Sequence, residues 1–193
     1  MEQYSCQIII CPGIHNPEFT QEFLQGLQRC ATGNLANKLN QDVLILPNQD
    51  YPSYCAIHIL ADLQHYLNSK KTPIIFIAFS AGVVGAIGAA WGWQILGGAV
   101  TGLIALDGWG VPLSGNFPIH RLSHDEFTHW SCALFGRGEE SFYGDPAVDH
   151  LDLWRKADVC QGWWIHPAQG GVGEKRTPIT AAEFIIKLLQ RYL

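Results

Sequence analysis

The sequence predicts an α/β fold: a three-layer α/β/α sandwich in which helices cover both faces of a mostly parallel sheet of about six strands. Apolar runs rich in β-branched residues alternate with helical patterns along the chain, and several runs are apolar on both faces, as buried parallel strands are. The segment from Thr72 to Leu106 contains no Asp, Glu, Lys or Arg, which is typical of the centre of such a sheet. The chain has 193 residues with no repeat or linker, so we expect one domain, residues 1–193.

Four strands and three helices are expected before residue 107. The strands are short apolar runs that end at a proline or a small-residue turn, and they cover residues 7–11, 43–46, 73–79 and 102–106. The helices have apolar residues at helical spacing; they cover residues 17–30, a segment that begins near residue 53, and residues 81–96. This alternation of strands and helices favours parallel pairing.

The rest of the chain begins with a Gly- and Pro-rich excursion over residues 107–122. Ser123 and Glu126 then form a capping box for a helix, and Thr180 and Glu183 form another for the last helix. Between them the patterns predict a weak strand, a short helix and a further strand, over residues 141–144, 150–157 and 159–165.

The composition argues against several classes of protein. The net charge is −5 and the 12 lysines and arginines are scattered, so we expect neither a nucleic-acid partner nor an anionic membrane surface. The six cysteines form no CxxC pair, which favours reduced thiols over a metal site, and no cofactor is expected. Residues 1–4 lack the basic region of a signal peptide, and we expect a cytoplasmic protein.

The charge-free segment has two explanations, a membrane span or a buried strand–helix–strand unit. A span needs about 20 continuous apolar residues in one helix. Here a β-branched run is followed by a Ser-Ala-Gly turn, a glycine-rich helix and a second strand. We therefore expect a buried unit and no membrane partner.

Ser80 lies at the predicted turn from strand to helix, in the sequence AFSAG of residues 78–82. This is the G-x-S-x-G pattern with alanine at the first small position. A serine on such a turn has a strained backbone, and large side chains two residues before or after it would clash. The turn presents the Ser80 hydroxyl at the carboxyl edge of the sheet and puts the Ala81 N–H at a helix N-terminus, where it can stabilise an oxyanion.

With this turn, the chain resembles the α/β-hydrolase fold, in a small single-domain form without a cap, over nearly its whole length. The first strand ends in CPGIH, residues 11–15, which is similar to the oxyanion loop of that family. The resemblance implies that Ser80 is the nucleophile. It also implies that the oxyanion is held by N–H groups of Ala81 and of the loop residues Gly13, Ile14 and His15.

Two triads satisfy the family's chain order of serine, acid and histidine. Asp145 lies in a Gly-Asp-Pro turn that resembles the family's acid turn, and by the predicted strand count it follows the second strand after Ser80, where the acid usually lies. His166, after the last strand, is then the base. In the alternative, Asp107 follows the first strand after Ser80 and His150 is the base. We prefer the triad with Asp145 and keep the one with Asp107 open.

Three further histidines, His120, His124 and His129, lie between the two candidate acids. Their spacing of four and then five residues is compatible with a metal-binding face. It spans a predicted loop and a helix start, however, so we expect the solvated flank of a helix and no metal ligands.

The predicted reaction is hydrolysis of a small-molecule ester or thioester through an acyl-enzyme on Ser80. Trp109 lies in the excursion after Asp107, which would overhang the nucleophile and form a wall of the substrate pocket. Aromatic walls and few charges favour an uncharged, partly apolar acyl group. The alternative is a catalytically inactive binding protein of the same fold.

Overall fold

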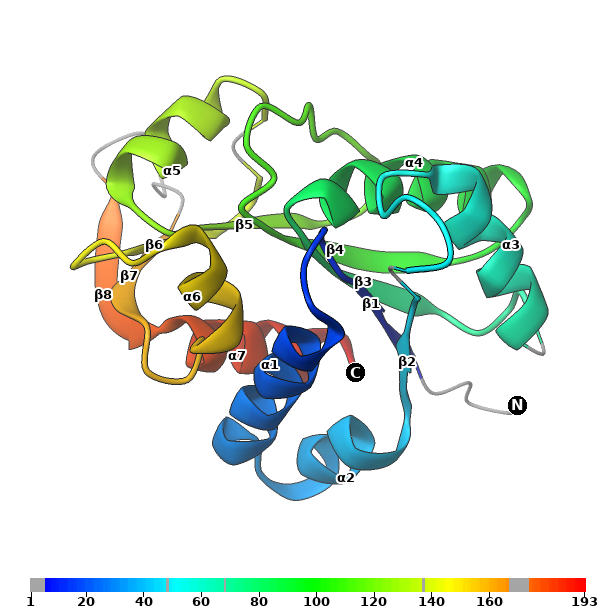
Figure 1. Ribbon diagram of the computed structural model, residues 1–193, viewed down its shortest axis with the longest axis horizontal. Coiled ribbons are helices and arrows are strands. Elements are labelled where there is room, and N and C mark those ends of the chain that lie inside the picture. Colours follow the sequence, from blue (N-terminus) through cyan, green and yellow to red (C-terminus); the bar gives the residue numbers. More distant parts are fainter. Residues whose placement is uncertain (1–5, 48, 68, 137, 167–173) are drawn as a thin grey trace.

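Eight strands form one sheet at the centre of the molecule (Figure 1). The computed structural model describes residues 6–47, 49–67, 69–136, 138–166 and 174–193, and the strand order is β2-β1-β3-β4-β5-β6-β7-β8. Neighbours are parallel up to β6, whereas β7 and β8 pair antiparallel. The strands are β1 (Gln7–Cys11), β2 (Val43–Ile45), β3 (Ile74–Phe79), β4 (Val100–Leu106), β5 (Ile119–Ser123), β6 (Ser141–Gly144), β7 (Gln161–His166) and β8 (Lys175–Thr180). The expected α/β class with a mostly parallel sheet is confirmed, with eight strands where about six were expected.

Helices pack on both sides of this sheet, and each side has its own apolar core (Figure 1). The described residues form α1 (Pro17–Cys30), α2 (Gly33–Gln41), α3 (Ala56–Tyr66), α4 (Ala81–Ile95), α5 (Glu126–Ala133), α6 (His150–Arg155) and α7 (Ala181–Tyr192). The core on one side is built with α3 and α4, and the core on the other with α1, α6 and α7. Alternate residues of β3 enter the two cores, so that strand is buried along its whole length.

The charge-free segment comprises β3, α4 and β4, in that order along the chain. The two strands are neighbours in the middle of the sheet, and α4 packs against it. A charge in β3, or in the buried part of β4, would have to be desolvated without a partner, which explains the composition of the strands. The helix α4 exposes Val84, Trp91 and Ile95, so burial does not explain why it lacks charges. None of the helices in the described part of the chain is both long enough and apolar enough to cross a bilayer.

The sequence patterns missed β5, which lies inside the segment expected to be a loop. Its polar residues concealed it, because they are buried and paired rather than exposed. Arg121 donates hydrogen bonds to the carbonyl oxygens of Val111, Phe135 and Gly136, and His120 pairs with the Tyr192 hydroxyl at 2.7 Å.

The caps of two helices were predicted with different success. The capping box of Thr180 and Glu183 at α7 is confirmed. The box at Ser123 is wrong, because the N-cap of α5 is Asp125, whose carboxylate accepts the Thr128 N–H at 2.6 Å. Ser123 instead belongs to β5, whose ladder continues to that residue. The helix α2 and the strand β8 were also not expected from the sequence.

Candidate active site

Ser80 lies between β3 and α4, at the carboxyl edge of the parallel strands. Its backbone has φ 53° and ψ −122°, a conformation that is strained for a residue with a Cβ. Its N–H donates to the carbonyl oxygen of Leu106 at 2.8 Å, and its own carbonyl accepts the N–H of Val83 at 3.0 Å. The chain therefore passes from the sheet to the helix within one residue. Gly82 permits this turn, because a Cβ there would collide with the carbonyl oxygens of Cys11 and Pro12.

The Ser80 hydroxyl is the first member of a continuous hydrogen-bonded chain. Its Oγ lies 3.1 Å from Nε2 of His150, and Nδ1 of His150 lies 2.8 Å from Oδ2 of Asp107. Since a carboxylate can only accept, Nδ1 carries the proton and Nε2 is left to accept from the serine. The His150 ring also stacks on Phe79 at 4.7 Å between centroids, which limits its orientation. The structure thus brings together the members of the Asp107 alternative.

Asp107 directly follows β4 and is buried, with 1% of its side chain exposed. Its φ is 49°, so it is the second strained non-glycine residue at this edge of the sheet. Its N–H donates to the carbonyl of Leu122 on β5 at 2.8 Å, which fixes its backbone between two strands. A buried carboxylate needs hydrogen-bond donors, and Asp107 has three from two histidines.

His124 provides two of these donors and was not expected to be part of a site. It directly follows β5, and its backbone N–H lies 3.0 Å from Oδ1 of Asp107, while its Nδ1 lies 2.9 Å from Oδ2. The hydrogen bond to Asp107 raises the pKa of His124, against the opposite effect of burial. The predicted solvated histidine flank is therefore wrong for His124, and also for His120, which is fully buried. The signal that could have found His124 is its place directly after a strand, once β5 is recognised.

The loop after β1 lies beside the serine, as the resemblance implied. A Cβ on Gly13 would lie 3.1 Å from Cβ of Ser80, and the Gly13 carbonyl accepts the Ser53 hydroxyl at 3.3 Å. Ala81 is the first residue of α4, so its N–H has no acceptor within the helix and lies next to the Ser80 hydroxyl. Ile14 is 72% exposed, so it is open to a ligand at this edge.

The His15 ring is fixed by its own hydrogen bond and by contacts with aromatic side chains. Its Nδ1 donates to the carbonyl oxygen of Asn16 at 2.9 Å, and its ring packs near Phe19, Phe79 and Trp154. Burial lowers the pKa of His15, and the nearby His150 adds to that effect. The imidazole nitrogen at hydrogen-bond distance from Ser80 Oγ is Nε2 of His150, at 3.1 Å.

A cleft of about 610 Å³ opens over Ser80 and His150. Its apolar wall consists of Val84, Trp109, Val111 and Phe127, and no Lys or Arg is among its lining residues. The Trp109 indole N–H donates to the Ser131 hydroxyl at 3.2 Å, which ties the excursion after Asp107 to α5. Trp109 lines the same cleft as Ser80, and its role as a wall of a substrate pocket stays a prediction.

Asp145 and His166 are not brought together with Ser80. The carboxylate of Asp145 accepts the Trp163 indole N–H at 2.7 Å, and Nε2 of His166 lies 3.3 Å from the Thr177 hydroxyl. The cause is the direction of β7: because it runs antiparallel to β6, its last residue His166 lies at the edge where β6 begins. With β5 counted, Asp145 also follows the third strand after Ser80 rather than the second.

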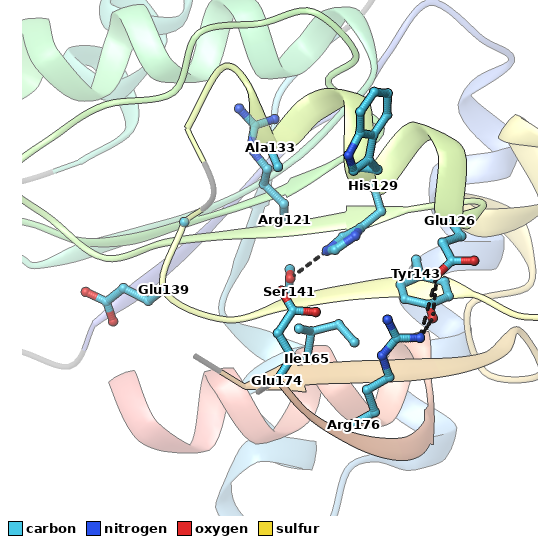
Figure 2. Close-up of a pocket in the computed structure, with 12 residues that line it drawn as sticks. Arg121, Glu126, His129, Ala133, Glu139, Ser141, Tyr143, Ile165, Glu174 and Arg176 are labelled. Carbon is cyan, nitrogen blue, oxygen red and sulfur yellow. Dashed lines mark hydrogen bonds and ion pairs between the residues drawn. The ribbon is translucent and has the colours of Figure 1, made fainter. Parts of the chain in front are cut away.

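A second serine–histidine pair lies in another pocket, of about 180 Å³, under α5 (Figure 2). Nε2 of His129 is 2.8 Å from Oγ of Ser141, the first residue of β6. Figure 2 shows Tyr143, Glu126 and Arg176 beside this pair, with Arg176 donating to the Tyr143 hydroxyl at 2.8 Å. The lining of this pocket is mixed, because Trp130, Ala133 and Ile165 also contribute to it.

Comparison with known proteins does not assign this chain to a family. A scan against models of protein families finds no match, and no curated protein matches the sequence. The case for a function therefore rests on the geometry of this chain alone.

Proposed function

We propose that the chain is a serine hydrolase of the esterase or thioesterase type, with Ser80 as nucleophile, His150 as general base and Asp107 as the acid that orients it. The observation that carries the proposal is the chain of two hydrogen bonds from Ser80 Oγ through His150 to Asp107, at 3.1 and 2.8 Å. It starts from a strained serine at the N-terminus of a helix, which is the setting of an activated nucleophile.

The fold supports the same conclusion. The three residues occur in the chain order serine, aspartate, histidine, and they follow β3, β4 and β6, whose carboxyl ends meet at one edge of the sheet. This order and the parallel strands from β2 to β6 support an α/β-hydrolase-like architecture. Asp107 takes the acid position one strand after the nucleophile.

In the proposed reaction, His150 Nε2 takes the proton of the Ser80 hydroxyl as Oγ attacks the carbonyl carbon of the ester. The carboxylate of Asp107 keeps the Nδ1–H tautomer and stabilises the imidazolium that forms. The N–H of Ala81 and an N–H of the Gly13 loop donate to the oxyanion. His150 then gives its proton to the leaving oxygen or sulfur, and water releases the acyl group by the same steps in reverse.

The cleft favours an acyl group that is neutral and apolar. Val84, Val111 and Phe127 offer contact area without a charge, and Trp109 closes the same side. Since none of the described residues that line the cleft is a lysine or an arginine, they offer a free carboxylate or phosphate on the substrate no cationic partner.

Turnover of p-nitrophenyl butyrate tests the proposal. We expect hydrolysis by the wild type and a loss of at least about 10³-fold in kcat for Ser80→Ala, because the nucleophile is removed. Absence of turnover by a folded wild type across acetate, butyrate and octanoate esters would contradict the proposal.

A further inference from the structure

The Asp107 carboxylate has two imidazole neighbours, and the proposed triad uses one of them. Nδ1 of His150 and Nδ1 of His124 lie 2.8 and 2.9 Å from the same oxygen, Oδ2. One ligand atom from each of Asp107, His124 and His150 can be chosen so that all three lie within 4.8 Å of one another. One carboxylate and two imidazoles are a donor set typical of a divalent transition metal.

The spacing of these atoms is close to what a metal ion requires. Zinc binds imidazole nitrogen and carboxylate oxygen at about 2.0–2.2 Å in tetrahedral sites, so the two Nδ1–Oδ2 distances of 2.8 and 2.9 Å need to lengthen by about half an ångström. The two rings also turn slightly, so that each Nδ1 faces the ion in place of Oδ2. The side chains of His124 and His150 are 25% and 43% exposed, and both line the cleft over Ser80. An ion can therefore enter from the cleft, and a water molecule can complete its coordination on that side.

The outer groups of such a site are already in place. A histidine that binds a metal through one nitrogen usually donates its other N–H to an oxygen. Nε2 of His150 has Ser80 Oγ at 3.1 Å, and Nε2 of His124 has a carboxylate oxygen of Asp125 at 3.5 Å. The free oxygen of Asp107 accepts the His124 backbone N–H at 3.0 Å, so all three ligands have an orienting partner.

The charges around the site also favour a cation. Asp107 and Asp125 both line the cleft, and no lysine or arginine is among its lining residues. A metal ion would therefore meet negative charge without displacing a fixed positive one.

We propose that Asp107, His124 and His150 form a binding site for a divalent ion of the zinc type, coordinated by Oδ2 of the aspartate and Nδ1 of both histidines, and that this ion inhibits the hydrolase. The inhibition, though not the binding, rests on the proposed function. Coordination at Nδ1 of His150 moves its proton to Nε2 through solvent. Nε2–H then donates to the Ser80 hydroxyl and can no longer accept the serine's proton.

Titration of chelator-stripped protein with Zn²⁺, followed by calorimetry, tests the binding. We expect one ion per chain in the wild type. His124→Asn removes a ligand and keeps an N–H donor for Asp107, and we expect it to weaken binding by more than about 100-fold, since even the loss of an outer partner costs about 10–100-fold. His65→Asn, on the exposed side of α3, is the matched control and should bind as the wild type does.

A second variant covers the case in which His124→Asn fails to fold. Asp125→Asn retains an N-cap for α5, because asparagine caps as well as aspartate. It removes the charged outer partner of His124, and we expect Zn²⁺ binding to weaken by about 10–100-fold. Co²⁺ bound in place of Zn²⁺ should show no thiolate charge-transfer band, because the ligands are nitrogen and oxygen. A thiolate band, or equal binding by wild type and both variants, would overturn the site.

Ser80→Ala separates this proposal from the proposed function. We expect this variant to lose ester turnover and still bind Zn²⁺ within about tenfold of the wild type, because only an outer partner is lost. In the wild type, Zn²⁺ should block turnover and EDTA should restore it, and the activity that His124→Asn retains should need over 100-fold more Zn²⁺ for half inhibition. A wild type that turns over esters without binding Zn²⁺ refutes the metal site alone. One that binds Zn²⁺ without turnover refutes the hydrolase alone.

Discussion

Two serine–histidine hydrogen bonds can be compared in the described part of the chain, and the shorter one lies outside the proposed active site. Ser141 Oγ is 2.8 Å from His129, whereas Ser80 Oγ is 3.1 Å from His150. Distance alone would therefore select a different pair from the one that we propose as catalytic. The two pairs differ instead in the backbone that carries each serine and in the group behind each histidine.

Ser141 is an ordinary member of a strand. It pairs with Arg121 on one side and Ile165 on the other, so both its neighbours along the sheet are fixed by ladder hydrogen bonds. Ser80 ends a strand and begins a helix with a positive φ, which frees its hydroxyl from the sheet and places helix N–H groups beside it. A serine becomes a nucleophile through this setting, and its hydrogen bond to histidine is only one part of it.

The largest expected effect comes from exchanging each serine for alanine. Ser80→Ala should reduce ester turnover by at least about 10³-fold, and Ser141→Ala should leave kcat within about twofold, because its hydroxyl lies in the other pocket. Both variants should keep the wild-type circular dichroism spectrum. Similar losses in the two variants would mean that the comparison assigns the nucleophile wrongly.

The second-largest expected effect comes from replacing the proposed catalytic acid, Asp107. Asp107→Asn should lower kcat by roughly 10⁴-fold, because an amide no longer enforces the Nδ1–H tautomer of His150. Asp145→Asn is the matched control, and we expect little change, since that carboxylate pairs with Trp163. If Asp145→Asn carried the loss instead, the acid assignment would have to be reversed.

The next prediction concerns stability rather than turnover. His120 on β5 is buried, and it makes the stability of the fold sensitive to acid. Burial lowers the pKa of His120 to about 4, whereas an unfolded histidine titrates near 6.5. As the pH falls below about 6.5, the unfolded chain gains a proton that the folded chain does not, so stability is lost down to about pH 4. His120→Gln, measured by urea unfolding at about pH 7 and about pH 4.5, should remove a pH-dependent loss of about 2–3 kcal/mol. His58→Gln, on the exposed side of α3, should leave that loss in place.

The smallest effect concerns the apolar wall of the cleft. Trp109→Ala removes contact area for the acyl group but no reacting atom, so we expect KM for octanoate esters to rise by about tenfold with a smaller change in kcat. Acetate esters, which do not reach the wall, should be affected less. Equal losses for both esters would show that Trp109 supports the structure of the site rather than the fit of the substrate.

The most local features of this architecture could be predicted from sequence. The strand β3, the turn at Ser80 and the helix α4 follow from an apolar run, small residues and their order, all of which are local patterns. Burial on both faces also explains the absence of charge in β3. Asp107 was identified as a candidate because it directly follows β4.

The choice of partners for Ser80 depended on non-local facts. β5 is concealed by buried polar residues whose partners, such as the carbonyl of Gly136 for Arg121, lie elsewhere in the chain. Without β5, the strand count favours Asp145, and His124 is assigned to the start of the helix predicted after Ser123. The antiparallel direction of β7, which removes His166 from the site, is set by sheet pairing and leaves no trace in its own residues.

The central claim is that Ser80 is an activated nucleophile, and the most direct test is the location of a covalent adduct. The wild type should be treated with a fluorophosphonate and digested, and the labelled peptide identified by mass spectrometry. The account predicts one adduct, on Ser80, which is lost in Ser80→Ala and retained in Ser141→Ala. An adduct on Ser141, or a folded wild type without any adduct, would contradict it.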